Sequence, residues 1–244
     1  MKIPAISGVI RRRILLNYRV SPEVAQQVLP EGFRPKVYRG YAIAGVCLIR
    51  LEELRPKGMP ALIGISCENS AHRIAVEWEG HDGRLMDGVF VPRRDTNTRF
   101  MSWAGGRIFP GAHHFSQFQI VDEGGRISVN VLPEGDESPL VQLDLYETDA
   151  FPSASIFESL EASSDFFESG CVGYSTRPDS CVLDGLSLRV QNWVVSPLRA
   201  EGVRSSYFEN RTLFPEGEIA FDHALLMRDI DHEWHSEPLM NVGS

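Results

Sequence analysis

Apolar and polar residues alternate through most of the chain, which is the pattern of strands that bury one face of a sheet. Residues 8–20 show it, with Val9, Ile14 and Leu16 set among polar neighbours. A Glu-Gly-Gly segment at residues 123–125 separates two such runs and is typical of a β-hairpin turn. The same reasoning predicts strands near residues 35–38, 41–51, 63–69, 73–79, 84–91, 114–121, 126–132 and 140–148, and four or five more within 171–230.

Three short helices are expected between the strands. The Ser-Pro-Glu segment at residues 21–23 predicts the first, because serine caps a helix, proline suits its first position and an acidic side chain suits its first turn. Asp95 and Thr96 predict a second helix that runs through Trp103. Apolar residues at helical spacing predict a third, amphipathic helix over residues 154–168, packed on the sheet.

The chain has no internal repeat, low-complexity segment or linker that would divide it. Its 21 glycines and 15 prolines among 244 residues indicate many short strands joined by turns. We therefore expect residues 1–244 to form a single β-rich α+β domain.

The charge balance argues against nucleic acid as a partner, because a formal net charge of −9 repels phosphate. The basic run at residues 11–13 lies inside an apolar alternating stretch and interrupts any secretory signal. Outward-facing strand positions and an anion-binding role both remain open for these arginines. The longest apolar stretch, residues 41–49, is far shorter than the roughly 20 residues that span a bilayer. We expect a cytoplasmic protein without a membrane partner.

Signatures of metal or cofactor binding are absent. The four cysteines occur singly, and no glycine-rich nucleotide motif, nucleophile elbow or metalloprotease motif is present. Cys47 and Cys67 lie in apolar strand-like runs, which favours buried free thiols. The cluster at residues 231–235 could be drawn as a metal site, but it alternates like an edge strand or tail, so we expect no metal and no cofactor.

Two segments carry more chemical information. Glu68 lies in an apolar strand, where it either faces solvent or is a buried acid that needs a partner. His113 and His114 are adjacent at the start of a strand and therefore point to opposite faces. One of them could line a cavity, and a purely structural role is the alternative for each.

These segments resemble the acetoacetate decarboxylase superfamily. The opening RRRILLNYRVSPEVAQQVLP, the segment ENSAHRIAVEWEG from Glu68 and the later GGRIFPGAHH are similar to its strands and first helix. The nearest resemblance is to an uncharacterised bacterial branch, a domain-of-unknown-function group sometimes called YqjF-like. The resemblance implies an antiparallel double sheet or closed barrel with a few short helices, and a possible homo-oligomer.

The same resemblance implies which residues occupy the positions of the family's chemistry. An arginine of the decarboxylase falls on Arg11, a glutamate on Glu68, and the lysine pair on His113 and His114. No lysine follows Lys57, so a Schiff base at that position is not expected.

We therefore predict a protein that binds or converts a small oxo acid or carbonyl compound by acid/base chemistry. Arg11 would hold an anionic oxygen, His113 would act as general acid or base, and Glu68 would orient His113 or shuttle the proton. A non-catalytic ligand-binding or scaffold protein of the same fold is the alternative. The second group of candidate residues, for substrate binding, is Arg107, His114 and Trp103.

Overall fold

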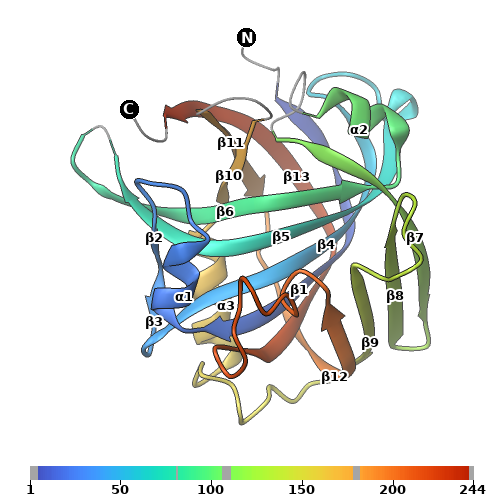
Figure 1. Cartoon of the computed structure of the whole chain (residues 1–244). Coiled ribbons are helices and arrows are strands. Elements are labelled where there is room, and N and C mark those ends of the chain that lie inside the picture. Colours follow the sequence, from blue (N-terminus) through green and yellow to red (C-terminus); the bar gives the residue numbers. More distant parts are fainter. Residues whose placement is uncertain (1–4, 81, 106–110, 178–181, 242–244) are drawn as a thin grey trace.

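Strands make up most of the computed structural model, which describes residues 5–80, 82–105, 111–177 and 182–241. They belong to one hydrogen-bonded sheet (Figure 1). The strands are β1 (Ile6–Val20), β2 (Arg34–Pro35), β3 (Val37–Tyr38), β4 (Tyr41–Pro56), β5 (Ile65–Glu79), β6 (Leu85–Thr96), β7 (His113–Glu123), β8 (Arg126–Pro133), β9 (Val141–Glu147), β10 (Val172–Thr176), β11 (Val182–Val190), β12 (Ser196–Ser205) and β13 (Ile219–Asn241). The helices are α1 (Pro22–Gln27), α2 (Arg99–Ala104) and α3 (Leu160–Ser169), with a 3₁₀ turn at Ala61–Ile63.

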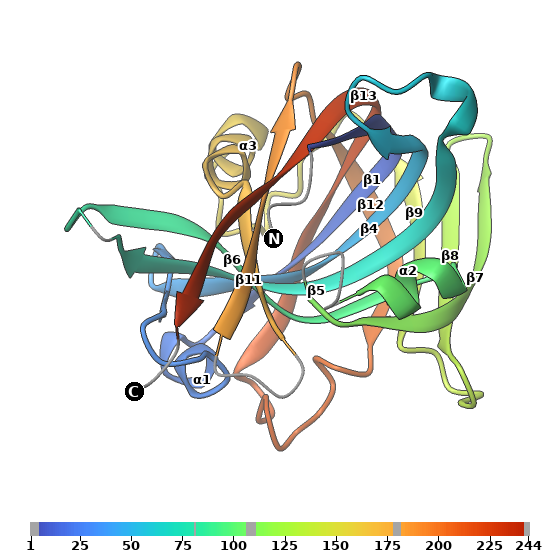
Figure 2. The same ribbon diagram turned by 90° about the horizontal axis from the view of Figure 1, so that it is seen from above.

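The sheet closes into two rings that share a wall (Figures 1 and 2). The larger ring runs β13-β1-β4-β5-β6-β7-β8-β9-β12 and returns to β13. The smaller ring runs β13-β1-β4-β5-β6-β10-β11 and also returns to β13. This double ring has the β-rich architecture with few short helices that the sequence predicts.

The two rings separate at β13 and β6, because each of these strands has two partners along one edge. The first half of β13 pairs with β12, and its second half pairs with β11. Strand β6 pairs with β10 around Phe90 and with β7 around Asp95, in both cases parallel. Apart from these two pairings the hydrogen-bonded neighbours run antiparallel.

The main hydrophobic core fills the larger ring. Alternate residues of the shared wall, including Ile14, Leu16 and Val46, pack there against strands from the opposite side of the ring. The other face of β1 presents Leu15 to a separate apolar cluster that includes Phe166 of α3. One face of the shared wall therefore packs into the main core, and the other face partly packs against α3 and partly lines the smaller ring.

Several elements differ from the sequence prediction at their boundaries. Strand β5 is continuous where two strands were expected, because its middle residues pair with both β4 and β6. Helix α2 begins after Thr98, whose hydroxyl accepts a hydrogen bond from the Met101 amide, and not at Asp95. Helix α3 begins after Ser159, which caps it in the same way. Within the described ranges no helix is long and apolar enough to cross a membrane.

The segment at residues 231–235 is not an edge or a tail. It is the middle of the long β13, which pairs with β1 on one side and β11 on the other. No group of histidine, cysteine and acidic side chains suited to a metal ion occurs among the residues that the structure describes.

Candidate functional site

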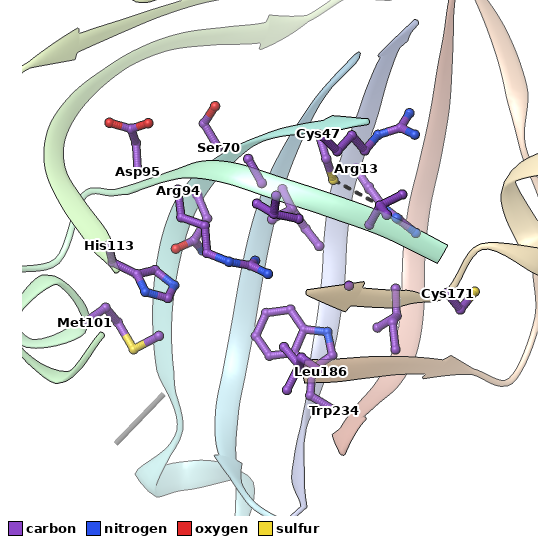
Figure 3. A pocket seen from close by; sticks show the side chains of 18 of the residues that line it. Arg13, Cys47, Ser70, Arg94, Asp95, Met101, His113, Cys171, Leu186 and Trp234 are labelled. Carbon is purple, nitrogen blue, oxygen red and sulfur yellow. Dashed lines mark hydrogen bonds between the residues drawn. The ribbon is translucent and has the colours of Figure 1, made fainter. Parts of the chain in front are cut away.

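A cavity of about 140 Å³ lies inside the smaller ring (Figure 3). Every strand of that ring contributes to its wall, together with Met101 of α2 and His113 of β7. An apolar cavity of about 150 Å³ accommodates a molecule the size of benzene, so this one suits a ligand of about six non-hydrogen atoms. Its apolar wall consists of Ile6, Ile49, Ala71, Val89, Val91, Met101, Leu186, Leu188 and Trp234.

Three arginines line this cavity without an acidic partner in the part of the chain that the structure describes. They are Arg13 on β1, Arg73 on β5 and Arg94 on β6. Among the residues described, none of the three forms an ion pair, although most other arginines do. Asp95 also lines the cavity, but its carboxylate accepts hydrogen bonds from Arg93 at 2.9 and 3.0 Å and from Ser116 at 2.9 Å. The cavity wall therefore carries uncompensated positive charge.

Burial lowers the pKa of both Arg73 and Arg94 to about 10. Each guanidinium is still charged at neutral pH, where the unpaired charge of a buried ion costs free energy. An anion that enters the cavity removes this cost and gains charge-assisted hydrogen bonds.

Neutral groups hold the three guanidiniums in place. Arg94 Nε donates to Ser175 Oγ at 3.0 Å. Arg13 Nε donates to Cys47 Sγ at 3.4 Å, and its guanidinium lies 5.4 Å from the centre of the Trp193 ring. Arg13 Nη1 also donates to Met227 Sδ at 3.8 Å. All these partners are neutral, so they orient each cation without neutralising it.

Arg73 is held by a buried polar chain. Its Nη2 donates to Asn17 Oδ1 at 2.5 Å, while its Nε is buried and has no hydrogen-bond partner among the described residues. Asn17 Nδ2 lies 3.0 Å from His223 Nε2, and His223 Nδ1 lies 2.6 Å from Asp222 Oδ2. Because the carboxylate accepts the proton of His223 Nδ1, Nε2 is the acceptor and the oxygen of Asn17 faces Arg73. This row of hydrogen-bonded side chains therefore contacts Arg73 through a neutral oxygen and not through a negative charge.

His113 lines the cavity as an uncharged imidazole. Burial, assisted by the nearby Arg94, lowers its pKa to about 4. Its Nδ1 lies 3.0 Å from the Gly111 carbonyl, so Nδ1 carries the proton and Nε2 is an acceptor. Figure 3 shows its ring beside Arg94. His114 is exposed and is not part of the cavity wall.

Glu68 does not line this cavity. Successive side chains of a strand point to opposite faces, so Arg73 reaches the smaller ring while Glu68 points into the larger one. There Glu68 Oε2 accepts a hydrogen bond from Arg12 at 2.9 Å, with Arg50 at 3.5 Å. Burial raises the pKa of Glu68, and the guanidiniums of Arg12 and Arg50 act against that rise. Glu68 is thus the buried, partnered acid that the sequence left as one of two alternatives.

Arg11 also lies outside the cavity. The pairing of β1 with β4 shifts between Ile10 and Arg12, so Arg11 sits at an irregularity of the ladder. Its exposed guanidinium pairs with Glu52 at 2.7 Å and Asp229 at 3.0 Å. Of the predicted trio Arg11, Glu68 and His113, the structure brings only His113 to the cavity, and Arg13 supplies the arginine of β1.

The remaining predicted residues, Trp103 and Arg107, are not found in the cavity wall as the structure describes it. Trp103 is on α2 with 56% of its surface exposed, whereas Met101 of the same helix reaches the cavity. Arg107 lies outside the residues that the structure describes. Arg13 belongs to the basic run for which the sequence left an anion-binding role open, whereas Arg73 and Arg94 are not among the predicted site residues. The available signal was the presence of arginine within apolar strand runs.

No lysine is found among the described residues of the cavity wall. Lys36 borders a smaller adjoining cavity of about 40 Å³ that shares Arg13 and Arg73 with the main one. Its ammonium group pairs with Asp87 and donates to Ser169 Oγ at 2.8 Å. The lysine of the adjoining cavity is therefore already engaged in an ion pair.

Comparison with known proteins adds a family and a fold. The model of the DUF2071 family, described as an uncharacterized conserved protein, matches residues 9–179. No curated protein is significantly similar in sequence.

Solved structures share the whole architecture at low sequence identity. Acetoacetate decarboxylase from Legionella pneumophila superposes with a TM-score of 0.67 and 10% identity, over 99% of this chain and 88% of that one. An acetoacetate decarboxylase-like enzyme from Sphingomonas wittichii RW1 gives 0.60 and 13%, over 98% and 93%. The enduracididine biosynthesis enzyme MppR, complexed with pyruvate, gives 0.59 and 14%, over 100% and 92%. At these identities the likeness shows the fold alone.

Proposed function

The chain belongs to the DUF2071 family of uncharacterized conserved proteins and has the acetoacetate decarboxylase-like fold. From this premise we propose that it binds or converts a small oxo acid in the cavity of the smaller ring. The observation that supports the proposal is the set of three arginines, Arg13, Arg73 and Arg94, that have no acidic partner among the described residues. A guanidinium fork binds a carboxylate through two parallel hydrogen bonds, so such a wall selects for carboxylates.

The size of the cavity and the character of His113 support the same class of ligand. Pyruvate, to which MppR is bound in one of the related structures, has six non-hydrogen atoms and matches a space of about 140 Å³. The acceptor Nε2 of the uncharged His113 can take a proton from a ligand, whereas an imidazolium could not. Any conversion would then proceed by acid/base chemistry, without a lysine Schiff base.

Calorimetric titration tests this proposal by comparing pyruvate with its neutral amide. We expect saturable binding of pyruvate and much weaker binding of the amide, because the amide lacks the charge that the arginines compensate. Arg94→Gln should weaken pyruvate binding about tenfold or more, since a hydrogen bond to a charged group contributes ~1.5–3 kcal/mol. Arg11→Gln is the matched control, because Arg11 is on the same sheet but outside the cavity.

Equal affinity for pyruvate and its amide, or equal effects of Arg94→Gln and Arg11→Gln, would refute the proposal. Catalysis is tested separately by following the bound oxo acid for product by nuclear magnetic resonance. Binding without product over many hours would favour the non-catalytic ligand-binding alternative.

A further inference from the structure

The cavity contains two thiols with opposite hydrogen-bonding roles. Cys171 Sγ donates to the Glu168 carbonyl at 2.9 Å, and burial raises the pKa of Cys171, so its proton is retained. Cys47 Sγ instead accepts a hydrogen bond, from Arg13 Nε at 3.4 Å (Figure 3). A thiol that donates its proton to a carbonyl is held in its unreactive form, whereas the contact of Cys47 with Arg13 leaves the thiol proton of Cys47 unengaged and places a cation beside its sulfur.

Cys47 lies within the cationic part of the wall. It is on the cavity face of β4 and is half-buried. Arg13, Arg73 and Arg94 all line the same cavity. Arg73 is 95% buried, and its Nε, which has no partner, gives a second sign that the site is built for a ligand. Cationic groups beside a cysteine promote reaction of its sulfur with electrophiles.

We propose that Cys47 is the nucleophile of this cavity and that its sulfur adds reversibly to the carbonyl carbon of a bound 2-oxo acid. A sulfur–carbon bond forms, the π pair of the carbonyl moves to its oxygen, and that oxygen takes up one proton. The thiol loses one proton to solvent, so the addition is neutral in protons and electrons. The product is a hemithioketal whose carboxylate stays among the arginines.

The inference deepens the proposed function and rests on it, because the arginines must first hold the carboxylate. In a 2-oxo acid the electrophilic carbon is bonded directly to the carboxylate carbon. A carboxylate at the Arg13 side of the wall therefore brings that carbon toward the sulfur that Arg13 contacts. Cys47 takes the part of a covalent partner in a cavity whose described wall contains no lysine.

Iodoacetate is a direct probe of this arrangement, because its electrophilic carbon is also bonded to a carboxylate carbon. The sulfur displaces iodide, so one sulfur–carbon bond forms and one carbon–iodine bond breaks. Iodoacetamide is the neutral counterpart with the same leaving group. The rates of modification of each cysteine are measured by peptide mass mapping of the intact folded chain, with glutathione as the reference thiol.

We expect the iodoacetate-to-iodoacetamide rate ratio at Cys47 to exceed that of glutathione about tenfold, the effect of ~1.4 kcal/mol of favourable charge interaction. Pyruvate should protect Cys47. Cys47→Ser should abolish the preference for iodoacetate, and the matched variant Cys171→Ser should retain it. A ratio at Cys47 equal to that of glutathione, preferential modification of Cys171, or failure of pyruvate to protect would each overturn the proposal.

Addition to the carbonyl is observed directly with pyruvate labelled at its carbonyl carbon. On binding, we expect a resonance of tetrahedral carbon that is absent with Cys47→Ser. The outcomes for the two proposals are distinguishable. If pyruvate and lactate bind equally well to the wild type and to Cys47→Ser and no tetrahedral carbon forms, the carboxylate site stands and the nucleophile is refuted. If neither acid binds the wild type, the proposed function itself fails.

Discussion

Replacement of Glu68 separates a structural role from a catalytic one. The side chains of Arg12 and Glu68 are 7% and 9% exposed and form a 2.9 Å ion pair inside the larger ring. Removing one partner of a buried pair typically costs ~3–5 kcal/mol, because the other charge is left uncompensated. In Glu68→Ala the carboxylate of Asp122 would still lie 3.2 Å from Arg12 and compensate part of its charge. We therefore expect a loss of stability at the lower end of that range, about 3 kcal/mol. Glu68→Gln retains an oxygen that can accept from Arg12 and should cost about half as much.

Urea unfolding measures this loss, and pyruvate titration well below the melting temperature measures the site. A loss of about 3 kcal/mol lowers the melting temperature by roughly 6–12 °C in a protein of this size. Pyruvate affinity should be unchanged, because Glu68 faces away from the cavity. Glu52→Gln is the control, since this half-exposed partner of Arg11 should contribute less than ~1 kcal/mol. Unchanged stability combined with lost pyruvate binding or turnover would show that Glu68 acts in the site and that our assignment of faces is wrong.

Two further predictions concern acid stability and the charge of the cavity. Burial lowers the pKa of His72 to about 4, so this side chain takes up its proton near pH 6.5 in the unfolded chain and only near pH 4 in the folded chain. The free energy of unfolding should therefore fall by ~3 kcal/mol for this residue as the pH drops from 6.5 to 4. In urea titrations at several pH values, His72→Gln should reduce this dependence on pH. A dependence equal to that of the wild type would contradict the reasoning. Asn17→Asp places a carboxylate against Arg73 and should weaken pyruvate binding about tenfold by calorimetry, whereas unchanged affinity would exclude Arg73 as an anion-binding group.

Local signals in the sequence predicted the elements well. Alternation located β1, and the glycine pair after Glu123 located the turn between β7 and β8. The Ser-Pro-Glu segment located the start of α1. The signal was weaker where β5 runs unbroken through Asn69–Arg73, because polar residues in a strand interior look like a turn until their pairing partners are known.

The candidate site was predicted only in part. His113 was expected to line a cavity and does so, whereas Arg73 and Arg94 of the same wall are not among the predicted site residues. The resemblance to the decarboxylase superfamily pointed to Arg11 and Glu68, yet both lie elsewhere. Sequence similarity in short motifs aligns residues along the chain, whereas the face on which a side chain emerges changes with every one-residue shift of the ladder.

The sequence by itself determined the β-rich class of the fold, the positions of most strands and the absence of any lysine beyond Lys57 that could replace the decarboxylase lysine. These properties depend on residue types and on the spacing of apolar residues along short segments, and both can be read directly from the sequence. The tertiary structure alone decided that Arg13, Arg73 and Arg94 share one cavity. They come from three strands whose pairing involves residues far apart in the sequence, and a shift of the ladder beside Arg11 selects which arginine of the basic run faces inward. The register between distant strands therefore brings these three arginines together, and no local sequence pattern reveals that register.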